Sequence, residues 1–343
     1  MNPKIIFFIF FLYFASLYST LCYGQSLSSR TWNLSPTMTA TLEDGILTVS
    51  TSKDSEEMPN VNPWFDFRVN IFTVIIEDKV TSIGGGAFRE CTNLTFATIP
   101  NSVASIGEIA FRGCSRLIYI PIPNSVTTIG QGAFADCYAL TSIEIPKSVT
   151  TIEQNTFQRC SGLTSIEIPN SVTTIGWWAF EWCTSLTSIE IPQSVTSIGD
   201  FAFATHVEIQ NLKDITVGWD RPLPVPDNVF GLSRFFPHTT LHVPVGTKSL
   251  YQTANVWRNF GTIVEYNPTD NERIVTQTLK AYSSNGFLYI VDIQSNKPLR
   301  VYNISGQLVY KGIAKSKSER IPINTNGIYI VVAENQAVKV IVE

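Results

Sequence analysis

Residues 122–144 read IPNSVTTIGQGAFADCYALTSIE and residues 168–190 read IPNSVTTIGWWAFEWCTSLTSIE, so two segments of 23 residues are nearly identical. The same interval separates the cysteines at Cys91, Cys114, Cys137, Cys160 and Cys183. It also separates the phenylalanines at Phe88, Phe111, Phe134, Phe157, Phe180 and Phe203. A fixed period of this length is typical of a solenoid, in which each unit forms one turn and stacks on the next.

Six units share the pattern I-P-x-S-V-T-x-I-G-x-x-A-F-x-x-C-x-x-L-x-x-I-x over residues 76–213, and the last unit is degenerate. Apolar residues recur at the same phase, so each turn buries its apolar face against its neighbours. The segment L-T-S-I-E-I-P, as in 140–146, is β-branched and alternating, and it predicts one short strand per turn that ends at the proline. Successive strands should then form a parallel sheet with a spacing of about 4.8 Å.

These units resemble the BspA-like subclass of leucine-rich repeats, which is common in surface proteins of Bacteroides and its relatives. The resemblance covers residues 76–203. It implies a mainly β fold, a right-handed leucine-rich-repeat solenoid with a parallel sheet. It also implies adhesion to host extracellular proteins or to other bacteria.

The first 24 residues have the layout of a secretory signal peptide, with Lys4, an apolar run over 5–15 and then a polar region. The apolar run is about half the length that a membrane-spanning helix needs. Cys22 raises the alternative of a lipoprotein signal, but Leu21 stands where that signal has a small residue. We expect an exported protein, secreted or held at the outer cell surface, with no transmembrane span in the mature chain.

Segments on both sides of the repeats are predicted to close the stack. Residues 25–75 form the N-terminal cap, with a D-G turn before the strand-like G-I-L-T-V-S and a P-W-x-x-x-R-x-x-I lead-in similar to that of the repeat family. Residues 214–266 form irregular repeats and a C-terminal cap, and 267–272 form a polar linker.

Residues 273–343 change to a period of two and predict a small antiparallel, Ig-like β-sandwich. The segments V-Y-N-I-S-G-Q, N-G-I-Y-I-V-V and K-V-I-V-E resemble the C-terminal sorting domain of the type IX secretion system. That resemblance implies an export signal that is cut off as the protein is anchored or released. An ordinary terminal Ig-like module for attachment is the alternative.

The sequence gives no sign of catalysis, and we expect neither an enzyme nor a cofactor. It contains no H-E-x-x-H, no G-x-S-x-G and no phosphate-binding loop. The net charge of −4 argues against nucleic acid as a partner. His238 and His242 lack a third ligand for a metal. The five cysteines left in the mature chain point the same way, which favours buried spacers over disulfides or zinc ligands.

Three tryptophans break the repeat at Trp177, Trp178 and Trp182. Other units mostly carry polar residues or glycine in these columns, so we expect the tryptophans to be exposed, together with Phe201 one unit later. Exposed aromatic clusters are enriched at interface hot spots. The alternative is that the degenerate last unit or the segment after it covers them.

The outward face of the strands supplies the second candidate surface. It stacks Glu144, Glu167 and Glu190, while Phe96 and Tyr119 occupy the upstream turns, so the face grades from aromatic to acidic. Such a face suits a protein partner, although the carboxylates could also serve a cation or only keep the sheet soluble. We therefore expect non-catalytic adhesion to a host matrix, plasma or bacterial surface protein. Carbohydrate recognition by the tryptophans and a purely structural spacer are the alternatives.

Overall fold

A computed structural model describes residues 29–205, 212–232, 236–267 and most of 280–342. Within the last range it leaves out 285–286, 292, 294–296, 304–307, 317, 324–326 and 334–335. The predicted signal peptide and linker residues 268–272 lie outside the described residues. None of the helices within the described ranges has the length and apolar character needed to cross a membrane.

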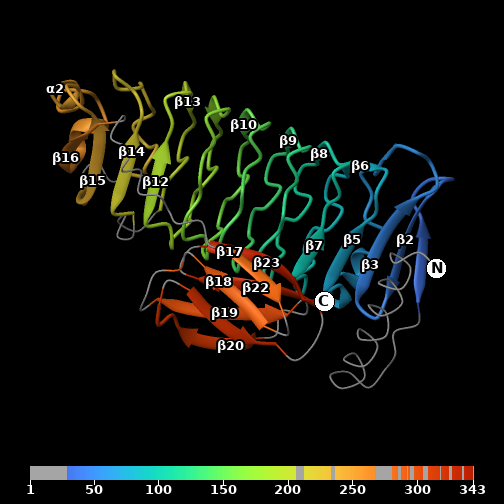
Figure 1. Ribbon diagram of the computed structural model, residues 1–343. Helices are drawn as coiled ribbons and strands as arrows, with labels where there is room; N and C mark the ends of the chain where they lie inside the picture. The colour runs from blue at the N-terminus through green and yellow to red at the C-terminus, as the bar shows by residue number, and fades with distance from the viewer. Residues whose placement is uncertain are drawn as a thin grey trace.

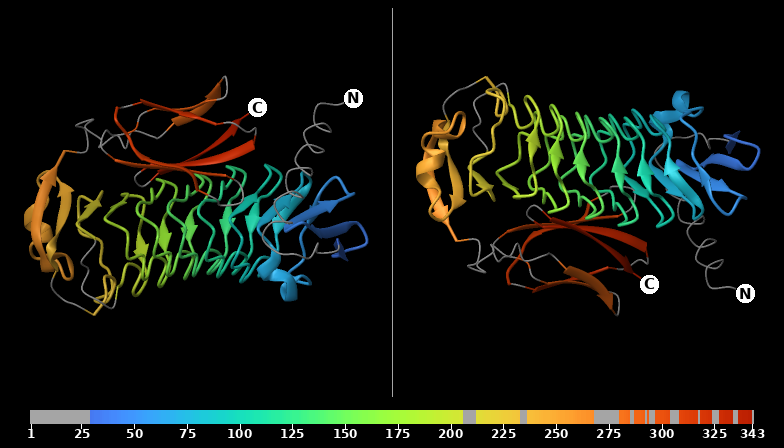
Figure 2. Two further views of the ribbon diagram at one scale, coloured as in Figure 1. Left: turned by 90° about the horizontal axis from the view of Figure 1, so that it is seen from below. Right: turned by 90° about the horizontal axis from the view of Figure 1, so that it is seen from above.

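The middle of the chain is a solenoid of stacked parallel turns, so the predicted mainly β fold is confirmed (Figures 1 and 2). One ladder of very short strands runs along the T-x-I segments of the repeat. It is divided into two sheets. The first comprises β4 (Glu56–Glu57), β6 (Val80–Ile83), β8 (Ser105–Ile106) and β9 (Thr128–Ile129), and the second comprises β10 (Thr151–Ile152), β11 (Thr174–Ile175) and β13 (Ser197–Ile198). All its pairings are parallel.

A second ladder follows the L-T-S-I-E segments and has regular strands only towards its ends. These are β5 (Thr73–Ile76), β7 (Phe96–Thr98), β12 (Ser188–Ile191), β14 (Asp214–Val217), β15 (Phe236–Pro244) and β16 (Phe260–Tyr266). The prediction of one strand per turn is therefore wrong for the middle turns of this ladder. There the turns are joined by isolated backbone bonds, such as Thr164 N–H to the Thr141 carbonyl at 3.2 Å.

Stacked phenylalanine rings form the centre of the solenoid. The six repeat phenylalanines are buried, and their ring centroids lie 5.2 to 5.9 Å apart from Phe88 to Phe203. The cysteine column lies beside them, with all five thiols buried and free of disulfides. From Cys114 onwards each thiol donates to the carbonyl of the phenylalanine 26 residues earlier, at 3.2 Å.

Aromatic residues end the phenylalanine stack on both sides. Trp64 stacks on Phe88 at 5.9 Å, and its indole N–H donates to the Ala87 carbonyl at 2.7 Å. At the other end Phe230 continues the stack from Phe203 and meets Trp257. The C-terminal end also contains α2 (Lys248–Tyr251) and η2 (Trp257–Asn259).

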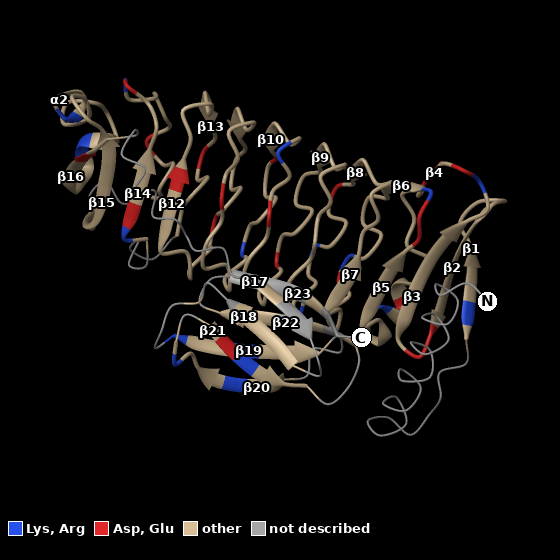
Figure 3. Ribbon diagram, viewed as in Figure 1, with Lys and Arg blue, Asp and Glu red and all other residues tan. Residues whose placement is uncertain are grey.

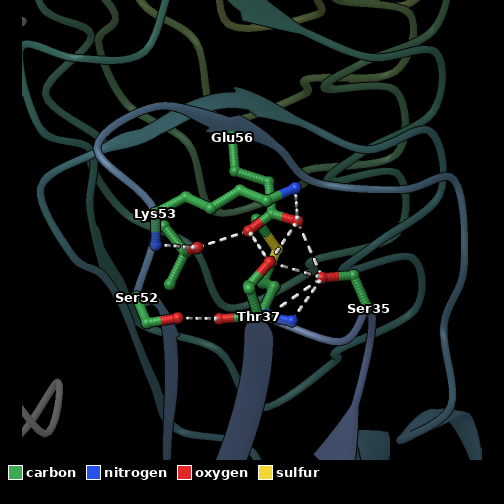
Figure 4. A network of polar contacts seen from close by, with 7 residues as sticks. Ser35, Thr37, Ser52, Lys53 and Glu56 are labelled. Atoms are coloured by element: carbon green, nitrogen blue, oxygen red, sulfur yellow. Dashed lines mark hydrogen bonds and ion pairs between the residues drawn. The ribbon is translucent and has the colours of Figure 1, made fainter.

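An antiparallel hairpin covers the N-terminal end, before η1 (Phe65–Asn70) and the first turns. Strands β1 (Arg30–Asn33), β2 (Met38–Glu43) and β3 (Ile46–Thr51) extend the sheet of β5 and β7. The predicted D-G turn joins β2 to β3, with Asp44 and Gly45 both at positive φ. At the other end of the hairpin, Figure 4 shows the Glu56 carboxylate accepting hydrogen bonds from the hydroxyl groups of Ser35 and Thr37. The Thr51 hydroxyl donates to the same carboxylate.

The C-terminal part forms two antiparallel sheets around a core of its own, as the period-two pattern predicts. One sheet has the order β17-β18-β21 and the other β20-β19-β22-β23. The strands are β17 (Lys280–Ser284), β18 (Phe287–Val291), β19 (Pro298–Asn303), β20 (Leu308–Ile313), β21 (Ser318–Pro322), β22 (Gly327–Ala333) and β23 (Gln336–Val342). This C-terminal sandwich lies alongside the solenoid (Figures 1 and 2).

Candidate binding surface

Two columns of left-handed backbone run along the turns of the solenoid, and they determine where the tryptophans point. The first column has φ between 48° and 65° and consists of Gly86, Ile109, Gly132, Asn155, Trp178 and Phe201. The second has φ between 59° and 76° and consists of Glu90, Gly113, Asp136, Arg159 and Trp182. This backbone region favours glycine and asparagine and is an outlier for bulky side chains.

Each of these turns is tied to the next by backbone hydrogen bonds. Trp178 N–H donates to the Asp200 carbonyl at 3.0 Å, and Trp182 N–H donates to the Ala204 carbonyl at 2.9 Å. The conformation is therefore imposed by the stack on whichever residue occupies the column. It directs the side chains of Trp178 and Trp182 to the rim of the turns rather than into the core.

Trp177, Trp178 and Phe201 form a continuous aromatic group on two adjacent turns, and Trp182 lies in the second column of the same turn as Trp178. Trp178 stacks on Phe201 with centroids 6.4 Å apart and planes within 8° of parallel. Trp177 meets Trp178 edge to face at 6.1 Å and is 52% exposed. Trp178, Trp182 and Phe201 are half-buried. We name Trp177, Trp178, Trp182 and Phe201 the rim patch.

Trp177 is also supported by the following turn. A Cβ built on Gly199 would fall 2.1 Å from Trp177 Cδ1, so only glycine leaves room for the indole where it lies. This contact supports one side of the ring, while the residue stays 52% exposed. Such a contact restricts the orientation of a large apolar surface.

Charged residues flank the rim patch in the same columns. The Asp136 carboxylate forms ion pairs with Arg112 at 3.2 Å and with Arg159 at 3.8 Å. Arg159 is the residue one turn before Trp182. Glu181 is buried and accepts from Gln158 Nε2 at 2.5 Å. The rim therefore passes from ion pairs to aromatic rings within one or two turns.

The acidic residues of the strand face lie where the repeat predicts. Glu144, Glu167 and Glu190 are exposed, and Glu167 and Glu190 are direct neighbours on adjacent turns. Figure 3 marks this acidic row in red, with Glu190 on β12. The structure does not bring the row together with the rim patch, which lies on the turns between the two ladders.

The register beyond Glu190 adds a pair that the sequence pattern did not indicate. The column continues through Thr216 to His242, and His242 Nε2 lies 2.8 Å from Asp214 Oδ1. This pairing needs a 28-residue step, which no longer follows the repeat period. Across the described residues no group of three potential ligands surrounds a possible metal position.

Tyr119, which the sequence predicts to be presented to a partner, does not lie on an open part of the strand face. It is 9% exposed because it packs against Phe96 and against Val332 of the C-terminal sandwich. Burial, together with the nearby Glu144 carboxylate, raises the pKa of Tyr119 to about 12. A contact between segments more than 200 residues apart leaves no periodic signal in the sequence.

Comparisons with known proteins agree with this geometry. Residues 62–162 and 150–217 match the family described as BspA type leucine rich repeat region. Residues 268–342 match a family described only as a domain of unknown function. The repeat region is therefore similar to leucine-rich repeats of the BspA type over residues 62–217. A search among curated proteins finds no significant match.

Several solved structures are similar to parts of this chain, with low overall superposition. A leucine rich repeat protein of T. pallidum is 23% identical with a TM-score of 0.35, covering 54% of this chain and 81% of its own. One from Eubacterium ventriosum is 25% identical with a TM-score of 0.31, covering 64% and 78%. One from Bacteroides ovatus is 21% identical with a TM-score of 0.36, covering 68% and 76%.

Proposed function

We propose that this protein is an exported, non-catalytic binding protein that adheres to a surface or matrix protein through the rim patch of its solenoid. The observation that carries the proposal is the placement of Trp178, Trp182 and Phe201 at left-handed positions where other turns use glycine, asparagine, charged residues and, once, isoleucine. Each such residue costs on the order of 1–2 kcal/mol relative to glycine. Packing of the solenoid does not account for this cost, because other turns close without aromatic residues at these positions.

The composition of the rim patch favours a protein as the partner. Tryptophan is the residue type most enriched at binding hot spots, which consist of an apolar centre within a polar border. Here Trp177 supplies an exposed centre, and Arg112, Asp136 and Arg159 supply a border of both charges. A partner with an apolar projection surrounded by charged groups would fit this surface.

The test uses residues borrowed from other turns, so that the stack is preserved. The variant carries Trp177→Gln, Trp178→Gly and Trp182→Gly, because Gln131, Gly132 and Gly113 occupy the same columns. We expect its binding to immobilised matrix and plasma proteins to fall on the order of 100-fold, since hot-spot side chains contribute about 2 kcal/mol or more. The free energy of unfolding should stay equal or rise.

Tyr138→Ser is the matched control. Tyr138 is an exposed aromatic on another column, and serine stands there in the units with Cys114 and Cys160. This variant should bind as the unaltered protein does. Equal binding by the triple variant and the unaltered protein would contradict the proposed adhesion and support a purely structural spacer.

Carbohydrate recognition is the second candidate, and the support beneath Trp177 favours it. A fixed, half-open indole is a surface on which a sugar ring can stack. A glycan array run beside the protein panel separates the two. Binding confined to glycans, and lost in the triple variant, would replace the protein partner by a sugar.

Export is part of the same proposal. Its support is the signal-peptide layout of residues 1–24 and the similarity of the C-terminal strands to a sorting domain. We propose that the C-terminal sandwich directs secretion and is then removed. Mass spectrometry of the exported protein tests this, because surface material that still ends at Glu343 would contradict removal.

A further inference from the structure

One strand of the C-terminal sandwich is buried on both faces. Tyr329, Val331 and Ala333 of β22 alternate into the core of the sandwich itself. Val332 lies between them and must point away from that core, because successive residues of a strand face opposite sides. It is nevertheless only 5% exposed.

The solenoid covers this outer face. Val332 forms a separate apolar cluster with Phe96 and Tyr119, and Ile118 and Tyr302 border it. Phe96 belongs to β7, which lies at the N-terminal end of the strand face (Figure 1). Tyr302 belongs to β19, the strand paired with β22. The sandwich therefore sits on the aromatic end of the strand face.

The same face is open further along the solenoid. Ser188 and Glu190 occupy the positions that Phe96 and Thr98 hold upstream, and both are exposed. The change from buried to exposed follows the change from aromatic to polar side chains. The site at which the sandwich docks, which we name the seat, is thus restricted to the turns that carry Phe96 and Tyr119.

Polar groups beside the seat are poorly satisfied. Thr98 Oγ1 and Ser142 Oγ are buried without a hydrogen-bond partner in the described part of the chain. Thr98 follows Phe96 on the same face, and Ser142 is the residue one turn after Tyr119. Burying hydroxyl groups without hydrogen-bond partners costs free energy, and this cost opposes the docked arrangement of the sandwich. The apolar cluster is small, so the contact is suited to opening.

We propose that the C-terminal sandwich is a detachable cover of the strand face, docked through Val332 on Phe96 and Tyr119. Its departure, by undocking or by the removal proposed above, would expose an apolar aromatic surface that suits the apolar face of a protein partner. The rim patch stays exposed whether the cover is docked or not. Failure of this inference is therefore distinct from failure of binding at the rim patch.

The first experiment places a charge in the seat of the full-length protein. Val332→Asp should undock the cover, which increases the radius of gyration in small-angle scattering. It should also return one tyrosine from a pKa of about 12 towards the usual value near 10, and Tyr119→Phe identifies that tyrosine in the ultraviolet titration. Val309→Asp is the matched control, because Val309 belongs to the same sheet and is exposed.

A variant on the solenoid side of the contact controls for unfolding of the sandwich by Val332→Asp. Tyr119→Asp leaves every residue of the sandwich unchanged and should produce the same increase in the radius of gyration. An unchanged radius in both seat variants would overturn the proposal. Loss of compactness that appears only on dilution would also overturn it, since the cover would then come from a second copy of the chain.

Discussion

The repeat cysteines act as hydrogen-bond donors to the backbone of the preceding turn. Burial raises the pKa of the Cys91 and Cys183 thiols to about 12, and it raises the pKa of Cys114, Cys137 and Cys160 as well. A neutral thiol can donate to a carbonyl and a thiolate cannot. The fold therefore depends on the protonated form.

We predict that the protein loses stability in alkaline solution as these thiols ionise. The native thiols keep their protons above pH 8.5, near which unfolded cysteine titrates, so unfolding releases protons and the free energy of unfolding falls as pH rises towards about 12. Each thiol contributes roughly 1.4 kcal/mol per pH unit in that window. Urea unfolding at pH 8, 9 and 10 measures the slope.

Cys137→Ala separates the thiols from lysine and tyrosine, which titrate nearby. This variant should be less stable at pH 8, and its slope against pH should be shallower by about one proton. An unchanged slope would show that the thiols do not determine the alkaline limit. The buried, unbridged role of this column could be predicted from the odd count and shared phase. The donor geometry could not, because it depends on how far each turn is offset from the last.

At the scale of the element, one carboxylate links the open end of the N-terminal hairpin to β4. Glu56 accepts from Thr37 at 2.9 Å and from Ser35 at 2.7 Å, and these bonds with the one from Thr51 lower its pKa to about 2. The residues come from the segment just before β2, from the end of β3 and from β4. The hairpin could be predicted from the D-G turn, but this network could not, because its members follow no pattern in the sequence.

We predict that the hairpin becomes less stable in acid. The pKa of Glu56 is lowered in the folded state, so its contribution is complete above pH 4.5 and is lost as pH falls from 4.5 to about 2. Hydrogen exchange of the β2 and β3 amides between pH 5 and pH 2.5 follows this loss. Glu56→Gln should raise exchange at pH 5 and remove most of the acid dependence, whereas Glu57→Gln, at an exposed neighbour, should do neither.

At the scale of the whole molecule, two cores are present in one chain. The solenoid and both its caps form one continuous cluster, and the C-terminal sandwich forms another. The interval of 23 residues was enough to predict the first, and the period of two the second. The continuation of the ring stack to Phe230 escaped prediction, because the step from Phe203 is 27 residues and the intervening loop breaks the phase.

We predict that the solenoid and the sandwich unfold in two separate transitions, and that only the transition of the solenoid depends on its caps. Trp64→Ala should lower the free energy of unfolding of the solenoid by about 3–5 kcal/mol, since it removes a fully buried ring that closes the phenylalanine stack. The transition of the sandwich should not move. Calorimetry resolves the two, and Trp177→Ala, which alters an exposed ring, should change either by less than about 0.5 kcal/mol. A single transition that shifts as a whole would contradict separate cores.

The seat of the sandwich near the start of the stack limits how long the solenoid can become. The chain leaves the C-terminal end at Asn267 and re-enters described structure at Lys280, so 12 residues connect the two parts. Such a segment spans at most about 40 Å. Every additional repeat would carry the departure point roughly 4.8 Å further from Tyr119. The addition of repeats would therefore first extend this connecting segment and then undock the sandwich. The number of turns is in this way coupled to the exposure of the strand face.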